Sequence, residues 1–117
     1  MLTRRHRLVT SQTFAQTVRR GRRSATRTLV LHLAARSDDP EGTPVPLEIG
    51  FVVNKAVGPA VTRNLVKRRL RHIARERLPA LPSSGALVVR ALPPAATASS
   101  TALSTDFDAA LARVRRG

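Results

Sequence analysis

The strongest constraint on the fold is a cation-rich segment between Thr62 and Arg75 that also carries a helical pattern of apolar residues. At about 100° per residue, Val66, Leu70 and Ile73 fall on one narrow arc of a helix. The other arc carries an amide and four cations, namely Asn64, Lys67, Arg68, Arg71 and Arg75. Such a helix is expected to bury its apolar arc and to present the other arc to a polyanion, because the guanidinium fork of arginine matches phosphate geometry.

A solvated charged helix is the alternative interpretation of this segment, and it would be expected to mix charge signs for solubility. The only acid between Arg63 and Arg77 is Glu76. The whole chain has 21 Lys and Arg against 7 Asp and Glu, a net charge of +14, which indicates a polyanionic partner, nucleic acid first. A membrane partner is not expected, since the sequence has no long apolar run and no amphipathic anchor with Trp.

The length of 117 residues predicts a single domain, 1–117. Its basic N-terminus is not followed by an apolar region, so we expect a basic arm over about 1–9 rather than a signal peptide. The absence of Cys excludes disulfides and thiolate metal sites. We therefore expect a cytoplasmic, single-domain protein that binds nucleic acid.

Apolar periodicity and turn residues predict the order helix, strands, helix, strand, helix, an α+β fold with one small sheet. The expected elements are a helix over about 10–20, strands over 25–33 and 47–54, the basic helix from Pro59 to about Leu78, a strand over 86–91 and a terminal helix. The turn-rich segment 37–44 is expected to connect a hairpin. Four apolar residues spaced by four, four and three define the buried face of the terminal helix: Leu103, Phe107, Leu111 and Val114.

Side chains for catalysis are scattered through the sequence. Three acids cluster in a Pro- and Gly-rich loop, Asp38, Asp39 and Glu41, where a solvated turn is expected rather than a metal site. The histidines at 6, 32 and 72 lack metal-ligand spacing, and no phosphate-binding loop of the Walker type is present. A weaker signal is the segment 54–58 before the basic helix, which is placed to cradle one phosphate. The chain thus supplies a basic surface, and chemistry is expected from another component.

The segment from Gly50 to Arg71 resembles the signature of bacterial ribonuclease P protein subunits. The pattern R-N-x-x-K-R-x-x-R is matched at every specified position, by Arg63, Asn64, Lys67, Arg68 and Arg71. The preceding G-x-x-V-x-K-x-x-G-x-A-V pattern also fits, from Gly50 to Val61. A looser match extends over most of the chain and includes Arg7, Leu8 and Phe14.

This resemblance implies a small α-β sandwich of order αβββαβα, with one four-stranded sheet and a left-handed crossover through the basic helix. It also implies a non-catalytic protein cofactor of ribonuclease P, which binds a catalytic RNA and the 5′ leader of precursor tRNA. The RNA is expected to supply the endonuclease active site and its Mg²⁺ ions. The protein alone is expected to bind no cofactor and to require no protein partner.

The resemblance implies two sets of site residues. The residues expected to contact the catalytic RNA are Arg63, Asn64, Lys67, Arg68, Arg71, Arg75 and Lys55. The residues expected in the leader cleft are Phe14, Val18, His32 and Arg90. Val18 and His32 stand where the family usually has aromatic residues, so this cleft is expected to hold the leader more by charge than by base stacking.

Two alternatives remain from the sequence. A structural RNA-binding protein, such as a ribosomal protein, would also be small and basic. A protein-only nuclease would need clustered acids, and the scattered acids of this chain oppose it. Stimulation of precursor-tRNA cleavage by a bacterial ribonuclease P RNA would separate the first alternative from the favoured function.

Overall fold

The computed structural model describes residues 21–34, 46–82 and 85–116. Its elements are β1 (Arg22–Ala25), β2 (Leu29–Ala34), β3 (Glu48–Val52), α2 (Ala60–Glu76), the 3₁₀ turn η2 (Leu78–Ala80), β4 (Ala86–Ala91), the 3₁₀ turn η3 (Pro93–Ala96) and α3 (Ser100–Arg116). The basic arm, the expected helix over 10–20 and the loop 37–44 lie outside the described residues. No helix in the described ranges is long and apolar enough to cross a bilayer.

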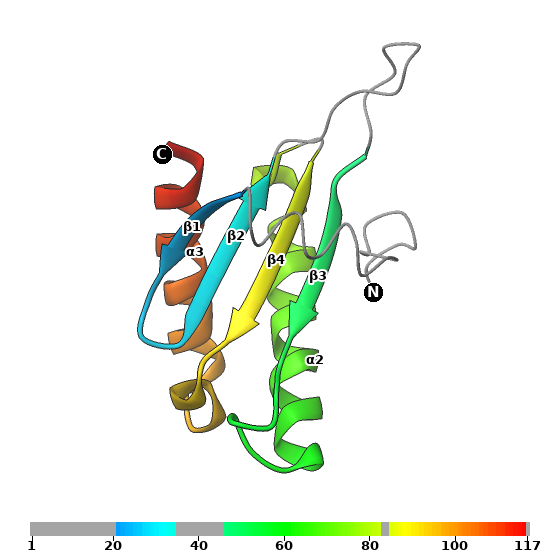
Figure 1. Cartoon of the computed structure of the whole chain (residues 1–117), viewed down its shortest axis with the longest axis vertical. Helices are drawn as coiled ribbons and strands as arrows, with labels where there is room; N and C mark the ends of the chain where they lie inside the picture. The colour runs from blue at the N-terminus through cyan, green and yellow to red at the C-terminus, as the bar shows by residue number, and fades with distance from the viewer. Residues whose placement is uncertain (1–20, 35–45, 83–84, 117) are drawn as a thin grey trace.

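The four strands form one sheet in the order β1-β2-β4-β3 (Figure 1). The pairs β1–β2 and β2–β4 are antiparallel, whereas β3 and β4 are parallel. The expectation of a hairpin across 37–44 is therefore wrong, because β4 lies between β2 and β3. An apolar strand buried on both faces belongs at the centre of a sheet, and every residue of β4 except Arg90 is buried.

The single strand expected over 25–33 is also wrong, because this region is a hairpin. The N–H of Thr26 donates to the carbonyl of Leu29 at 2.8 Å, and the Thr26 hydroxyl accepts from the Leu29 N–H at 3.2 Å. These local bonds turn the chain between β1 and β2, since Thr hydroxyls compete with ladder hydrogen bonds. Some of the branched residues that suggested one continuous strand thus lie in the turn between β1 and β2.

The connection from β3 through α2 to β4 has an unusual hand. In Figure 1, β3 and β4 both point downward, β4 lies to the left of β3, and α2 returns behind the sheet. This geometry makes a left-handed crossover, which the family resemblance implies and which departs from the usual right-handed rule.

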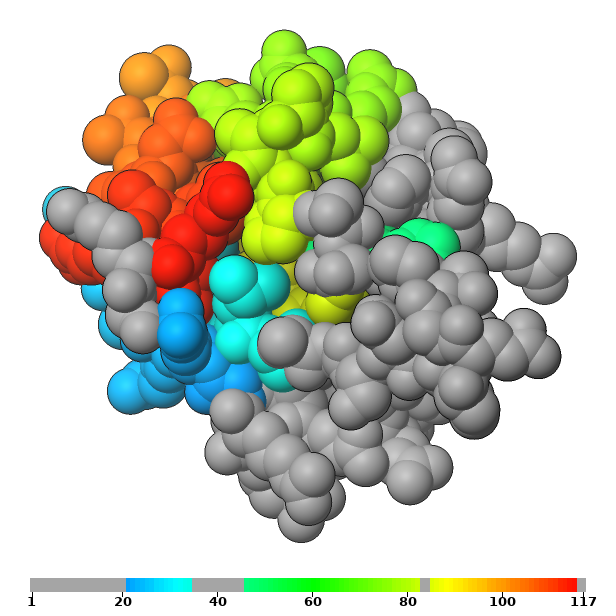
Figure 2. All heavy atoms as spheres, turned by 90° about the horizontal axis from the view of Figure 1, so that it is seen from above, coloured from blue at the N-terminus to red at the C-terminus, as the bar shows by residue number. Residues whose placement is uncertain are grey.

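Both described helices pack on one face of the sheet, side by side, and Figure 2 shows them from above. The predicted apolar arc of α2 is confirmed, since Val66, Leu70 and Ile73 are all buried. The predicted face of α3 is confirmed as well: Leu103, Phe107, Leu111 and Val114 are exposed by 6% or less. These side chains meet the odd-numbered residues of β2 and β4, such as Leu31 and Val89, in one core.

The ends of α2 differ by one or two residues from the expected ones. Pro59 is the N-cap rather than a residue of the first turn, and Arg77 is the C-cap. The α-helix ends at Glu76, and the 3₁₀ turn η2, which contains Pro79, follows it. Gly58 precedes the helix with a φ of +154°, and a Cβ built there would lie 3.2 Å from the Thr62 side chain. Glycine is therefore required at this turn.

Candidate nucleic-acid interface

The outward face of α2 is a row of polar side chains directed away from the core. Asn64, Arg68, Arg71 and Arg75 are exposed, and Lys67 is half-buried. Within the described ranges these five side chains have no hydrogen-bond or ion-pair partner. Four unpaired cations on one helical face favour a phosphate backbone, since each neutralised phosphate releases counterions.

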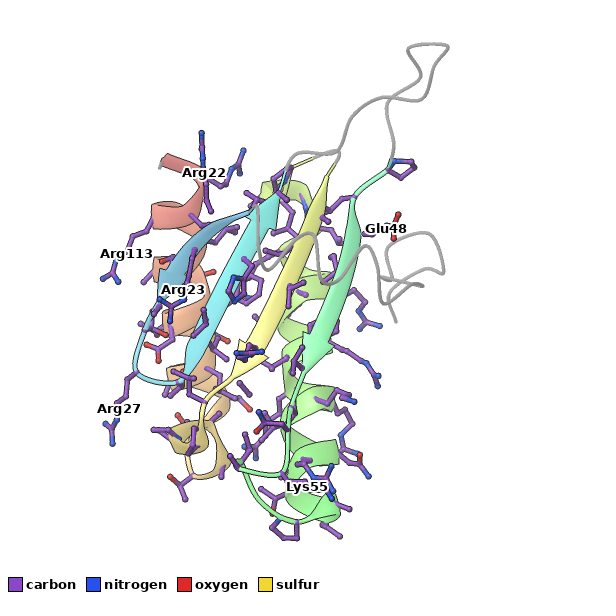
Figure 3. The ribbon with its side chains drawn as sticks, in the orientation of Figure 1. Arg22, Arg23, Arg27, Glu48, Lys55 and Arg113 are labelled. Carbon is purple, nitrogen blue, oxygen red and sulfur yellow. The ribbon has the colours of Figure 1, made fainter. Side chains whose placement is uncertain are left out.

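Arg63 and Lys55 lie at the N-terminal end of the same helix. Arg63 is half-buried, and its Nε donates to the carbonyl of Gly58 at 3.1 Å, so this side chain also fixes the turn before α2. Lys55 is exposed in that turn and projects from the lower end of the molecule in Figure 3. The two cations therefore extend the basic surface around the start of α2.

The phosphate cradle expected from residues 54–58 is not formed by this turn. The N–H of Ala56 donates to the Asn54 side chain at 3.1 Å, and the N–H of Val57 donates to the Asn54 carbonyl at 3.1 Å. The N–H of Gly58 donates to the carbonyl of Lys55 at 3.2 Å. Because these donors are used inside the turn, they are not available to an anion.

A second basic cluster lies on the sheet face opposite the helices. His32 pairs with Arg23 and Val88, and Arg90 pairs with Val30, so all these side chains point to the same face. His32 is only 4% exposed. Neither of its ring nitrogens, nor Nε of Arg90, has a partner among the described atoms. Buried polar atoms without partners are uncommon and mark a face suited to a polar ligand.

Burial lowers the pKa of His32, and the nearby charges of Arg90 and Arg23 lower this pKa further. The imidazole of the free protein is therefore neutral at neutral pH. Arg23 was missed by the sequence reasoning, because β1 was not recognised as a strand. The other expected cleft residues, Phe14 and Val18, lie outside the described residues.

The acids that the structure describes on the helices are engaged by basic or hydroxyl groups. Arg77 donates from Nε to Asp108 at 2.6 Å, and its Nη1 lies 3.7 Å from Glu76. The hydrogen bond that Arg77 donates to Asp108 raises the pKa of Arg77. Asp106 accepts from both the hydroxyl and the N–H of Thr28. In the described part of the chain, no three His, Cys, Asp or Glu side chains gather as metal ligands.

Comparisons with known proteins show which sequences this chain is similar to. A family model described as Ribonuclease P matches residues 2–115. A "Ribonuclease P protein component" of Nocardioides sp. is 53% identical over 117 residues, covering 97% of this chain and 95% of that protein. A protein of the same name from Salinispora tropica is 49% identical over 128 residues, covering 98% and 94% of the two chains.

The fold is similar to solved structures at low sequence identity. The Staphylococcus aureus RNase P protein superposes with a TM-score of 0.78 at 22% identity, covering 93% of this chain and 96% of that chain. The RNase P protein from Thermotoga maritima superposes with a TM-score of 0.77 at 20% identity, covering 92% and 96%.

Proposed function

The chain belongs to the ribonuclease P protein family, and from this membership we propose that it serves its complex by holding RNA on two opposite faces. It is a protein component of ribonuclease P, the endoribonuclease complex that processes the 5′ end of tRNA, and it has an RNA partner in that complex. The observation that best supports RNA binding is the outward face of α2, whose cations have no hydrogen-bond or ion-pair partner among the described residues. A ribosomal protein is not favoured by any of these relatives.

The first proposed contact joins α2 to the catalytic RNA. The proposed residues are Arg63, Asn64, Lys67, Arg68, Arg71, Arg75 and Lys55. Arg68, Arg71 and Arg75 are exposed on successive turns, spaced to follow adjacent phosphates. Arg63 is expected to contribute less than these three, because part of its guanidinium already holds the Gly58 carbonyl.

The second proposed contact is the leader of precursor tRNA, on the sheet face opposite the helices. The charges of Arg23 and Arg90 flank His32 on this face. The ring nitrogens of His32 and Nε of Arg90 have no partner among the described atoms, which supports a phosphate or base edge as their partner in the complex. Phe14 and Val18 are proposed to complete the cleft. The RNA substrate also implies a cytoplasmic protein.

We propose that cleavage itself is carried out by the RNA and its Mg²⁺ ions. Metal-assisted phosphodiester cleavage needs carboxylates that are free to hold the ions. Asp106 and Asp108 instead accept hydrogen bonds from Thr28 and Arg77, and Glu76 pairs with His72 and Arg77. These engagements support a structural use of the acids.

Reconstitution tests the proposed function. Purified chain is added to a bacterial ribonuclease P RNA with precursor tRNA at low Mg²⁺, and 5′-leader removal is measured. The chain is expected to raise kcat/KM severalfold above the RNA alone. An unrelated basic protein of similar size and charge is the control. If both proteins stimulate cleavage equally, the effect is only charge screening and the proposed function fails.

A further inference from the structure

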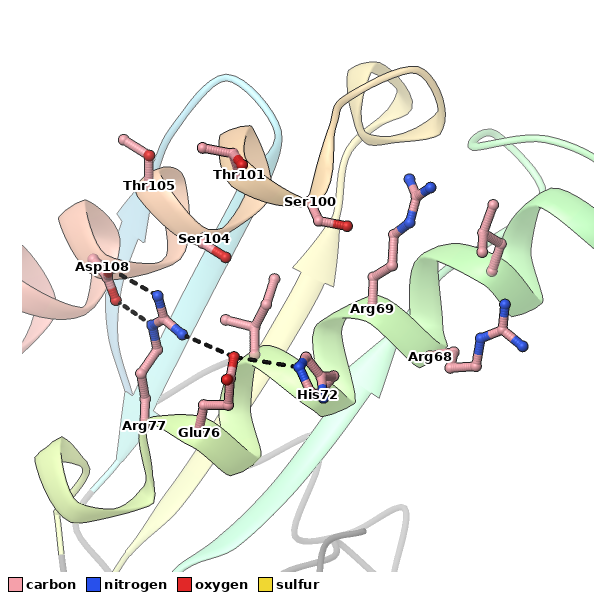
Figure 4. Close-up of a pocket in the computed structure, with 12 residues that line it drawn as sticks. Arg68, Arg69, His72, Glu76, Arg77, Ser100, Thr101, Ser104, Thr105 and Asp108 are labelled. Carbon is pink, nitrogen blue, oxygen red and sulfur yellow. Dashed lines mark hydrogen bonds and ion pairs between the residues drawn. The ribbon is translucent and has the colours of Figure 1, made fainter.

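An open groove of about 750 Å³ runs between α2 and α3, on the side of the molecule away from the sheet (Figure 4). Its α2 side carries Arg68, Arg69 and His72 above the apolar side chains of Leu65 and Ile73. Its α3 side is a row of hydroxyl groups, which belong to Ser100, Thr101, Ser104 and Thr105. A groove of this size is within the range of about 300–1,000 Å³ that small ligands and single nucleotides occupy.

This groove is distinct from the outward face of α2. Arg69 and Arg71 are two residues apart, which separates them by about 160° around the helix. Arg71 is exposed, whereas Arg69 is half-buried in the groove, with Arg68 on the border between the two surfaces. The R-N-x-x-K-R-x-x-R pattern does not specify Arg69, so no sequence motif pointed to this residue.

The guanidinium of Arg69 is fixed in the groove before any ligand binds. Its Nη1 donates to the carbonyl of Ala98 at 3.2 Å, which ties α2 to the segment before α3. The other donors of this guanidinium remain for a ligand, because arginine has five N–H donors in a rigid fork. A cation held in place in this way loses little side-chain entropy on binding an anion.

The carboxylates at the acidic end of the groove are engaged by neighbouring side chains, and Arg77 offsets part of their charge. Arg77 binds Asp108 through two hydrogen bonds, of 2.6 and 3.2 Å. His72 and Arg77 lie 3.4 and 3.7 Å from the Glu76 carboxylate. Figure 4 shows this chain of contacts closing one end of the groove, while Arg68 and Arg69 lie toward the other.

The N-terminal end of α3 contributes little as an anion site, since Ser99 already caps it. The Ser99 hydroxyl accepts from the N–H of Ala102 at 3.0 Å. The ligand groups of the groove are therefore side chains: two guanidinium groups, four hydroxyls and an apolar floor. This combination matches an unpaired nucleotide, whose phosphate suits arginine, whose ribose suits hydroxyls and whose base suits an apolar or guanidinium surface.

We propose that the α2–α3 groove is a second contact for the catalytic RNA and takes an unpaired nucleotide of it. The phosphate lies against Arg68 and Arg69, and the ribose lies against the hydroxyls of Ser100 and Ser104. This inference rests on the proposed function, because the catalytic RNA is the polyanion that α2 already faces. RNA is favoured over an acidic peptide because the hydroxyl row offers ribose and phosphate partners along the whole α3 side.

Crosslinking from the groove tests the proposal directly. The chain has no Cys, so Ser104→Cys carries a photocrosslinker at one defined position. Assembled with the catalytic RNA and precursor tRNA, it is expected to crosslink to one unpaired nucleotide of the catalytic RNA. Ala102→Cys, at an exposed position of α3 outside the groove, is the matched control. Crosslinks only to precursor tRNA, only to a second protein chain, or equally from both positions would overturn the proposal.

A charge substitution gives the second measurement. Ser104→Glu is expected to weaken binding of the catalytic RNA by about tenfold or more, because a carboxylate would face the phosphate. Ala102→Glu adds the same charge to the same helix and is expected to bind nearly as the unmodified chain. If Ser104→Glu also binds normally while Arg71→Ala weakens binding, the groove proposal fails and the proposed function stands. If the unmodified chain neither binds the RNA nor stimulates cleavage, the proposed function fails.

Discussion

At the scale of single residues, neighbouring cations of α2 have different surroundings. Arg71 projects into solvent, whereas Arg69 lies beside α3 and donates to the Ala98 carbonyl. Arg63 holds the turn at Gly58, and Arg77 joins α2 to α3 through Asp108. A count of positive charges would treat these residues alike. Their contacts separate the cations available to RNA from those that also stabilise the fold.

Arg71→Ala is expected to weaken binding to the catalytic RNA and to reduce the log–log slope of Kd against salt by about 1, because one phosphate contact is lost. Arg71 tests the outward face of α2 more specifically than Arg68 does, because Arg68 also borders the α2–α3 groove. Binding is measured by titration at several salt concentrations.

The matched control for Arg71→Ala is Arg27→Ala. Arg27 is exposed in the turn between β1 and β2 and projects from the β1 edge of the molecule in Figure 3. The Arg27→Ala substitution removes one positive charge and leaves the outward face of α2 unchanged. Equal affinity and equal salt slope for the two variants would show that the outward face of α2 is not the specific RNA contact.

His32 is expected to make the stability of the free protein depend on pH. Its pKa is lowered in the folded protein, by burial first and then by Arg90 and Arg23. The unfolded chain therefore binds more protons below about pH 6.5, the ordinary pKa of histidine. The free energy of unfolding should be highest above that pH and should fall as the pH decreases toward the folded-state pKa.

Urea denaturation between about pH 5 and 7 measures this effect, and His32→Leu should remove that part of the pH dependence. His72→Gln is the control, since His72 is an exposed residue of α2. An unchanged slope in His32→Leu would mean that another group titrates in this range.

At the scale of elements, α3 holds the β1–β2 hairpin as well as the core. Its apolar face covers the sheet, and Asp106 accepts two hydrogen bonds from Thr28 in the hairpin turn. Arg113 donates to the carbonyl of Ala25 in β1. The hairpin that the sequence did not reveal is thus tied to the helix that the sequence predicted well.

Phe107→Ala is expected to lower the free energy of unfolding by about 3–5 kcal/mol, because Phe107 is fully buried and its removal leaves a cavity. This loss is a large share of the roughly 5–15 kcal/mol typical of a domain. Denaturant unfolding followed by circular dichroism gives the value. Thr105→Ala, an exposed change on the same helix, should stay within about 0.5 kcal/mol. A similarly small effect for Phe107→Ala would contradict the docking of α3.

At the scale of the whole molecule, the sheet separates two basic surfaces. Both described helices lie on one side of it, so α2 directs its cations away from the face that carries His32 and Arg90 (Figure 1). A protein of net charge +14 with this arrangement can contact two RNA segments at once. This geometry suits the proposed function, in which the protein lies between a catalytic RNA and the leader of its substrate.

The protein without RNA is expected to cleave no precursor tRNA, even with added Mg²⁺, because its described helix acids are held by Arg77, His72 and Thr28. RNA-free protein is incubated with precursor tRNA, and the products are resolved on a denaturing gel. The same preparation must stimulate the catalytic RNA as a positive control. Specific 5′ cleavage by the protein alone would assign the chemistry to the chain and contradict the proposal.

The local pattern of the sequence was enough to predict α2, α3 and their buried faces, because a helix repeats its apolar residues within a few positions of the chain. Val66 and Leu70, or Leu103 and Phe107, needed no knowledge of distant residues. The family motif on α2 was equally local. What lay beyond such patterns was the hairpin at Thr26, the central position of β4 and the place of Arg69 in the groove.

Only the tertiary structure decided these features, because each depends on residues far apart in the chain. Strand order follows from which strands exchange hydrogen bonds, and alternation of side chains does not encode the choice of neighbour. β4 became central by pairing with β2 and β3 at once. Arg69 faces a groove only because α3 packs beside α2, and His32 meets Arg23 and Arg90 only across three paired strands. The sequence by itself thus determined the local faces, and long-range packing determined which faces meet.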